Sequence, residues 1–520
     1  MSTASNLRHS SSTRPSSPHT PQQQLRSGHS SFTSSTSPGS SFRNEDDAII
    51  FELGARWIRA GFEGSSSPSC VVGFGPEESR RAGDYRGWVE GAAGTGPLPK
   101  PVNADEWTRG YELWRHDLRE VDLGLVEDKI ERVFRETYNQ YLLTDAGSSR
   151  LVLTVPSLMP HPLLSSLLST LFSRWRFPSI TLLPSSTMSA TAAGLRSALV
   201  VDIGWAETTT TGIYEYREAI IKRSTRATKS LLQELGRFLS SLAGEDNASK
   251  DEISVGFKYC EEVACRFSWC RLQDSQVEST SGSERTVSIP SPTNPSQEYI
   301  DVPLTRFAES VEKVMLGPGI SESDFDDEEK TIPLLVYHTL LALPPDARGT
   351  CMSRIIFVGG GSRIPGLRQR ILKEVSLLID RYGWSPIRGK AVDRHRQRLQ
   401  ELKVSSQTNG DAIPAADAEK SHPSREEPEI DFVEQKLRRQ NKDIPVPVQG
   451  VLREVDSLGS WAGASLVTSL KTRGMVEIER EKFLQHGLAG STRDSEHPVP
   501  DRRSGLRAGD RSSWTLAGWA

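Results

Sequence analysis

The pattern of hydrophobic and polar positions predicts strands that alternate with helices along most of the chain. Short apolar runs bounded by glycine, proline or charged residues are typical of buried strands, as in "AIIFEL", "RLVLTVP", "SITLL" and "RIIFV". Elsewhere apolar residues recur every three or four positions, as at Val126, Ile130, Val133 and Phe134, which predicts a helix at about 124–141. An alternation of strand and helix favours an α/β architecture.

The same reasoning predicts the remaining elements. A second arm "RWIRAGFEG" follows the first strand, and "LVVDIGWAETTTTGIYEY" (199–216) forms a later hairpin. Further helices are expected at about 162–175, 186–195, 227–243, 250–269, 304–315 and 330–343, and 353–375 is expected to form a strand, a glycine turn and a helix. Two stretches rich in Gly, Pro or Ser, 64–110 and 274–298, are expected to consist mainly of loops.

Composition divides the chain into folded and unfolded parts. Only 36% of the 520 residues are hydrophobic, and residues 1–44 contain no acidic residue and are dominated by Ser, Thr, Pro and Gln. Such a segment cannot bury enough apolar surface to offset its conformational entropy. We therefore expect disordered tails over 1–45 and 488–520, and a polar insertion with little fixed structure at about 386–446.

Charge and cysteine usage exclude several classes of protein. The net charge is −4, from 63 basic and 67 acidic residues, which gives no broad basic surface for nucleic acid. No run approaches the roughly 18 apolar residues of a membrane span, and the first residues lack a signal segment. The five cysteines form no CxxC pair, so reduced thiols are expected. We expect a soluble intracellular protein that binds neither nucleic acid nor membrane.

Three glycine turns follow apolar strands: "FELGARWIRAGF", "VVDIGWAETTTTGIY" and "IFVGGGSRIPG". Each alone is compatible with a simple tight connection, although glycine lets backbone N–H groups approach a phosphate closely. Together, in this order, they resemble the actin-related protein family of the actin/heat-shock ATPase fold. The segments "LVLTVPSLMPHPLLSSLLSTLF" and "SWAGASLVTSLKTRGMVEIEREKF" resemble other parts of that family.

The resemblance implies an actin-like fold, in which two ribonuclease-H-like domains surround a nucleotide cleft. Domain I would comprise 46–192 plus 450–487, with a shortened small subdomain at 64–110. Domain II would comprise 193–449 and include the polar insertion.

The resemblance also implies a site for ATP or ADP with magnesium. The residues that it assigns to this site are Glu52, Gly54, Arg59, Asp202, Gly204, Glu262, Gly359, Gly360 and Gly361, with Asp202 on the metal side. Glu52 replaces a metal-site aspartate and Arg59 replaces a phosphate-binding lysine.

Several positions depart from the family pattern. Ala55 replaces a hydroxyl donor to phosphate, Arg56 replaces a glycine, and Ser185 replaces the glutamine that positions the attacking water. Trp205 and Ala206 occupy the tip of the second hairpin, and Glu261 stands where a cation is usual. Because the groups that orient water are missing together, we predict no competent hydrolysis and assign no catalytic residue. Nucleotide binding stays open, since the Trp205 indole can either fill the cleft or point outward.

A weak active site favours a role in assembly. Among divergent family members, the pattern is most similar to the fungal one at the pointed end of dynactin. That resemblance implies a non-catalytic capping subunit in the cytoplasm and cytoskeleton, which supports dynein-driven transport along microtubules. Its partners would be actin-related filament subunits and the other pointed-end subunits of dynactin. The alternatives are a nuclear subunit of a chromatin-remodelling complex and an actin-like ATPase.

Overall fold

The computed structural model describes residues 48–75, 100–115, 117–119, 121–144, 149–242, 251–272, 285–292, 299–317, 328–384, 450–472 and 475–490. These residues belong to one compact unit, Glu45–Ala520. The tails predicted over 1–45 and, beyond Gly490, over the C-terminal residues lie outside the described residues, as does the insertion at 386–446.

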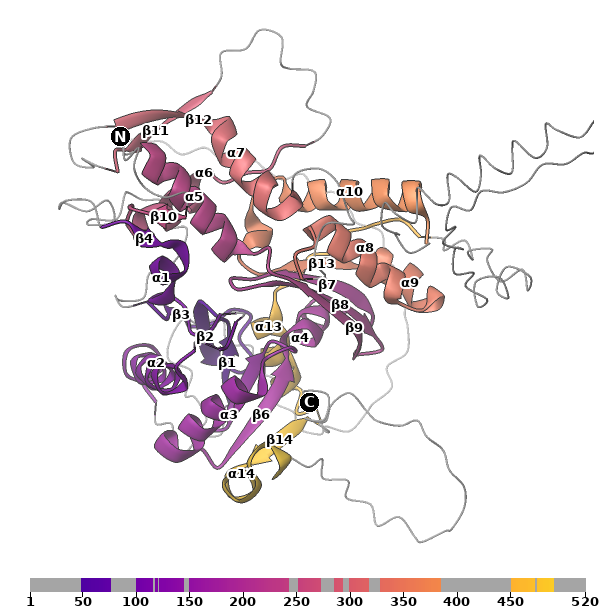
Figure 1. Cartoon of the computed structure of the whole chain (residues 1–520). Coiled ribbons are helices and arrows are strands. Elements are labelled where there is room, and N and C mark those ends of the chain that lie inside the picture. The colour runs from indigo at the N-terminus through magenta and orange to yellow at the C-terminus, as the bar shows by residue number, and fades with distance from the viewer. Residues whose placement is uncertain are drawn as a thin grey trace, which may run out of the picture. The chain divides into compact units, whose positions relative to one another are not determined.

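A six-stranded mixed sheet forms the first half of the fold (Figure 1). Its order is β14-β6-β5-β1-β2-β3, and its strands are β1 Ile49–Leu53, β2 Trp57–Phe62, β3 Cys70–Gly73, β5 Leu151–Val155, β6 Ser179–Pro184 and β14 Val476–Glu479. The first strand pairs antiparallel with β2 and parallel with β5. Its apolar residues are buried on both faces, as expected for a central strand covered by helices.

A four-stranded sheet of order β13-β7-β8-β9 forms the second half. Its strands are β7 Ala198–Ile203, β8 Thr208–Tyr214, β9 Arg217–Ser224 and β13 Ile355–Val358. The sheet repeats the plan of the first, because three strands form an antiparallel meander and β13 runs parallel to the first strand of that meander, β7. The stretch around Glu454 continues the sheet beside β13 through a parallel bridge to Ile355. This repeated topology is what the predicted actin-like fold requires.

Helices cover both sheets (Figure 1). In the first half they are α2 Leu123–Glu136, α3 His161–Thr170, α4 Ser185–Ala192, α13 Ser460–Ser469 and α14 Arg480–His486. In the second half they are α5 Thr228–Leu242, α6 Phe257–Phe267, α7 Leu304–Val311, α8 Ile332–Ala342, α9 Pro345–Met352 and α10 Leu367–Tyr382. Short π-helical or 3-10 segments are Thr137–Leu142, Leu171–Trp175, Glu312–Leu316, Gly361–Arg363 and Gly487–Gly490.

The helix α13, which comes late in the chain, completes the first half. It packs against α4, and a Cβ on Gly463 would come within 1.9 Å of the Met188 carbonyl oxygen, so only glycine permits this approach. The indole N–H of Trp461 donates to the carbonyl of Ile50 at 3.2 Å. A segment from the end of the chain therefore closes the core that the first strand begins.

Two small sheets and a short helix lie outside the main sheets. The strand β4 Val102–Asn103 pairs with β10 Glu252–Ile253, and β11 Thr286–Pro290 pairs with β12 Tyr299–Pro303. The helix α1 Ala104–Arg109 follows β4 directly, and Asn103 caps its N-terminus by accepting from the Asp105 N–H at 2.9 Å.

The predicted alternation of strands and helices is confirmed, with local corrections. The helix predicted at 250–269 is shorter, because β10 and a turn that ends at Gly256 precede α6. The two stretches predicted as loops contain β3, β4, α1 and β11, and α9 was not predicted. These strands are short and pair with distant partners, so their local sequence carries little periodic signal. Among the described helices, none is both long and apolar enough to cross a bilayer.

Candidate functional site

Two glycine hairpins face the region between the halves. In the first, between β1 and β2, the Gly54 N–H donates to the Trp57 carbonyl at 3.0 Å and leaves Ala55 and Arg56 at the tip. In the second, between β7 and β8, the Gly204 N–H donates to the Glu207 carbonyl at 3.1 Å. The two turns have the same hydrogen-bonding plan, as the repeated topology predicts.

The triple-glycine turn after β13 lies directly against the end of β7. Gly359 has a φ of 83°, and a Cβ there would come within 2.4 Å of the Asp202 Oδ1 atom. A Cβ on Gly361 would approach the Ile203 side chain equally closely, whereas Gly360 has open space around it. Two of the three glycines are therefore required for close packing on the strand that carries Asp202.

Asp202, Glu52 and Arg59 form one electrostatic group drawn from both hairpins. The Arg59 guanidinium donates to Glu52 at 2.5 Å. Burial, together with the nearby charge of Glu52, raises the pKa of Asp202 to about 6, although the charge of Arg59 opposes this shift. The family pattern implies a magnesium ion beside these carboxylates, and among the chain's own residues Arg59 supplies positive charge to this group.

Glu262 lies on α6 and is paired with a residue of the same helix. Its carboxylate is buried and accepts from the Nε–H of Arg266 at 2.7 Å. The two residues are four positions apart on one helix, which is the spacing of an intrahelical ion pair. Whether any of the nine residues assigned to the nucleotide binds one stays a prediction.

The buried side chain of Arg56 extends from the first hairpin to the second half. Its Nη2 atom lies 3.4 Å from each carboxylate oxygen of Glu261 on α6. Its guanidinium carbon also lies 4.2 Å from the ring centroid of Trp57 and 5.4 Å from that of Phe257. Two departures from the family pattern, an arginine for a glycine and a glutamate for a cation, thus compensate each other.

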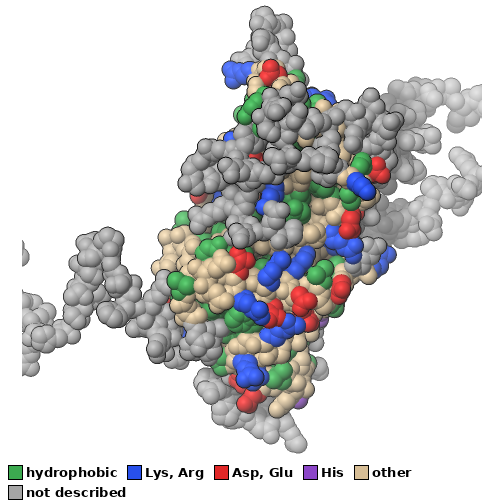
Figure 2. All heavy atoms as spheres, turned by 90° about the vertical axis from the view of Figure 1, so that its left-hand side faces the viewer, with side chains coloured by type: hydrophobic (Ala, Val, Ile, Leu, Met, Phe, Trp, Pro, Cys, Tyr) green, Lys and Arg blue, Asp and Glu red, His purple; other side chains and the backbone are tan. Residues whose placement is uncertain are grey.

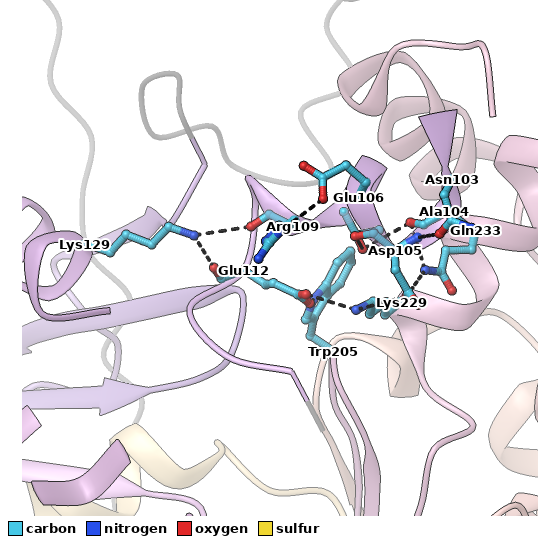
Figure 3. A network of polar contacts seen from close by, with 11 residues as sticks. Asn103, Ala104, Asp105, Glu106, Arg109, Glu112, Lys129, Trp205, Lys229 and Gln233 are labelled. Carbon is cyan, nitrogen blue, oxygen red and sulfur yellow. Dashed lines mark hydrogen bonds and ion pairs between the residues drawn. The ribbon is translucent and has the colours of Figure 1, made fainter. Parts of the chain in front are cut away.

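Trp205, at the tip of the second hairpin, points inward (Figure 3). Its indole N–H donates to the Glu112 carboxylate at 2.9 Å, and Lys229 of α5 donates to the other oxygen of that carboxylate at 3.0 Å. The indole packs against the hydrophobic cores of both halves and meets Phe257 edge-on, with ring centroids 6.0 Å apart. Of the two alternatives for Trp205, the structure supports the one in which the side chain fills space.

The segment 102–114 connects the two halves; we call it the linking segment. Its strand β4 pairs with β10, and the indole N–H of Trp107 donates to the Val255 carbonyl at 2.8 Å. Tyr111 stacks on Phe257 of α6 with ring centroids 3.7 Å apart. At its far end the Leu113 N–H donates to the Ala55 carbonyl at 2.7 Å, which ties the segment to the first hairpin.

Lys129 of α2 fixes the linking segment from the first half (Figure 3). Its ammonium group donates to the backbone carbonyl of Glu112 at 2.6 Å and to that of Arg109 at 3.3 Å. Burial lowers the pKa of Lys129, and the charge of Glu112 opposes this shift. Gln233 of α5 donates to the Ala104 carbonyl at 3.1 Å from the opposite side.

We call the residues that meet between the halves the central cluster: Arg56, Tyr111, Glu112, Trp205, Lys229, Phe257 and Glu261. Sequence reasoning singled out Arg56, Trp205 and Glu261 but missed the other four. For two of these, Tyr111 and Glu112, the available signal was the stretch "WTRGYELW", which is rich in aromatic residues.

The central cluster does not fit a bound magnesium nucleotide. The side chains of Arg56 and Trp205 extend from the hairpin tips, where a phosphate chain requires free backbone N–H groups and no bulk. Both cationic groups of the cluster already have carboxylate partners from the chain.

Comparisons with known proteins agree with this fold. A family model described as "Actin" matches residues 43–242. The chain is 25% identical to actin-related protein 2 of Oryza sativa subsp. indica over 351 residues, or 65% of this chain and 82% of the relative. It is 20% identical to actin-related protein 10 of Dictyostelium discoideum over 357 residues (63% and 73%), and 21% identical to actin-related protein 4 of Oryza sativa subsp. indica over 388 residues (64% and 85%).

The fold is therefore the actin fold, which in general binds nucleotide with magnesium. Over 63–65% of its length the chain is similar to these actin-related proteins.

Proposed function

We propose that this protein is a non-catalytic actin-related protein that serves as a structural subunit of a larger assembly. The observation that supports this proposal is the central cluster, in which the bulky side chains of Trp205 and Arg56 extend from the tips of the two hairpins that would clamp a phosphate chain. Catalysis of hydrolysis requires groups that position water and stabilise charge, and Ala55 and Ser185 supply neither at the expected positions. The surfaces of such a subunit, rather than its cleft, would then carry its function.

We further propose that the assembly is dynactin and that the protein caps the pointed end of its actin-related filament. The similarity to actin-related protein 10 supports this choice, together with the overall divergence of the hairpins. Actin-like subunits join through head-to-tail contacts that propagate, so a subunit with one altered end stops growth. In this role the protein is cytoskeletal and supports dynein-driven transport through contacts with filament subunits and the other pointed-end subunits.

A nuclear role is the second candidate, because actin-related protein 4 matches over a similar share of the chain. Figure 2 shows one face of the molecule, on which the described Lys and Arg side chains are interspersed with Asp and Glu. Direct binding of nucleic acid is not favoured by such a mixed surface.

Affinity purification of the tagged full-length protein, followed by mass spectrometry, tests the proposal. We expect dynactin subunits, including the filament-forming actin-related protein, to be recovered together. Recovery of chromatin-remodelling subunits without any dynactin subunit would contradict the capping role. The non-catalytic part is tested separately by the turnover assay described in the Discussion.

A further inference from the structure

We propose that the central cluster is an internal substitute for the nucleotide: it holds the two halves of the fold together by itself and makes their arrangement independent of ATP. This inference goes beyond the proposed function, because it applies to the protein in whichever complex it resides. The fold generally binds a nucleotide, whereas the residues of the central cluster do not fit a nucleotide, and the inference accounts for this difference.

The first argument is that the polar members of the cluster join the two halves, either directly or through the linking segment. Arg56 comes from the first hairpin and reaches Glu261 on α6 of the second half. Trp205 and Lys229 come from the second half and converge on Glu112 of the linking segment. A nucleotide bound between the two hairpins would connect the halves in the same way, since each half would contribute residues that bind it.

The second argument is charge balance. The cluster holds two cations and two carboxylates, and each cation is paired with a carboxylate: Arg56 with Glu261 and Lys229 with Glu112. All four side chains are largely buried, so their charges interact in a medium of low polarity. A triphosphate inserted here would face two carboxylates and find both cations already engaged, which opposes its binding.

The third argument concerns the linking segment, which secures the cluster from both sides. Its strand β4 and the Trp107 indole are hydrogen-bonded to the second half, and the backbone carbonyl of Glu112 accepts from Lys129 of the first half at 2.6 Å. Its side chains also pack in both hydrophobic cores, with Ala104 in the second and Leu113 in the first. Figure 3 shows Lys129, Trp205 and Lys229 converging on Glu112. The segment therefore supplies permanently the bridge that a ligand would supply reversibly.

Amide hydrogen exchange of the full-length protein, read by mass spectrometry, tests this inference. The informative peptides cover 102–114 and α6, and a peptide over β5 reports on global folding. We expect millimolar magnesium-ATP to leave exchange in the wild-type peptides unchanged. In Glu112→Gln the first two peptides should exchange about tenfold faster while β5 keeps its protection, because the substitution removes a buried, charge-assisted pair without changing shape.

Two further variants make the test decisive. Glu106 lies in the same segment but pairs with the exposed Arg109, so Glu106→Gln should exchange like the wild type. Trp205→Ala should reproduce the effect of Glu112→Gln. Loss of protection in β5 would mean that Trp205→Ala unfolds globally, and the inference is then tested by comparing Glu112→Gln with Glu106→Gln. The inference is overturned if magnesium-ATP protects either peptide in the wild type, or if Glu112→Gln exchanges like Glu106→Gln. Neither result bears on which subunits are recovered by affinity purification, so the two proposals fail independently.

Discussion

The Arg56 guanidinium and the Glu261 carboxylate lie 3.4 Å apart between the two halves of the fold, although 205 positions separate them in the chain. Both side chains are largely buried. Removing one partner of a buried ion pair leaves the other charge without compensation, which costs about 3–5 kcal/mol. The protein should therefore be less stable when one member of the pair is removed than when both are present or both are replaced.

We expect Arg56→Met to lower the free energy of unfolding by about 3 kcal/mol, and the double variant Arg56→Met/Glu261→Met to recover much of that loss. Urea unfolding of the full-length protein measures both. The matched control is Arg109→Met, which breaks the exposed pair with Glu106 and should change stability by less than about 1 kcal/mol. A single Arg56→Met variant as stable as the control would contradict the structural importance of the pair.

Trp205→Ala should lower the free energy of unfolding by about 3 kcal/mol, because it empties the space between the two hydrophobic cores and leaves Glu112 with one donor fewer. The exposed Tyr299→Ala should stay within about 0.5 kcal/mol of the wild type. Urea unfolding again provides the measurement. If the two variants are equally stable, the indole does not fill the space as described.

The charge of Asp202 should make stability depend on pH in a defined direction. Its pKa is raised to about 6 by burial and by Glu52, so the folded state binds a proton more tightly than the unfolded state does. The contribution of this carboxyl is most favourable at low pH and is lost as pH rises through about 6. We expect Asp202→Asn to be more stable than the wild type at pH ~7.5, with a smaller difference at pH ~5.

Chemical unfolding at the two pH values measures the difference between wild type and Asp202→Asn. The informative quantity is the change with pH in the stability difference between the two proteins, because the contributions of the other titrating groups are the same in both and cancel. A difference that grows as pH falls would show that Arg59, not burial, dominates the environment of Asp202.

The full-length protein should hydrolyse radiolabelled ATP no faster than a buffer blank, because Ser185 and Ala55 provide no group to orient water or bind the terminal phosphate. Asp202→Asn serves as the control for a contaminating ATPase, since a contaminant is indifferent to that substitution. Turnover in the wild type that disappears in Asp202→Asn would disprove the non-catalytic assignment.

The sequence was informative wherever the signal was local or came from the order of motifs. The glycine turn at 359–361 was predicted to belong with Asp202, and the structure brings them into contact because only glycine fits against the end of β7. Arg56, Glu261 and Trp205 were each recognised as departures from the family pattern. What could not be read from the sequence was that Arg56 and Glu261 compensate each other, since their meeting depends on the packing of α6 against the first hairpin.

Glu262 carried a local signal of another kind. The resemblance assigned it to the nucleotide site, and in the structure it pairs with Arg266, one helical turn away. That spacing was visible in the sequence and predicts an intrahelical ion pair without any reference to a ligand. Glu112 was missed for a different reason: it follows the stretch expected to form loops, at a place without a periodic pattern, and only its three-dimensional partners reveal it.

The way in which α13 closes the first half has a consequence for biosynthesis. Trp461 reaches back to Ile50 over 411 positions, and β14 supplies the outer neighbour of β6 equally late. While the ribosome is still translating, the emerging first sheet therefore keeps one unpaired edge and an unfilled core, which are the features that recruit chaperones and promote aggregation. A protein truncated before Ser460 should accumulate in inclusion bodies, however well its N-terminal elements are formed.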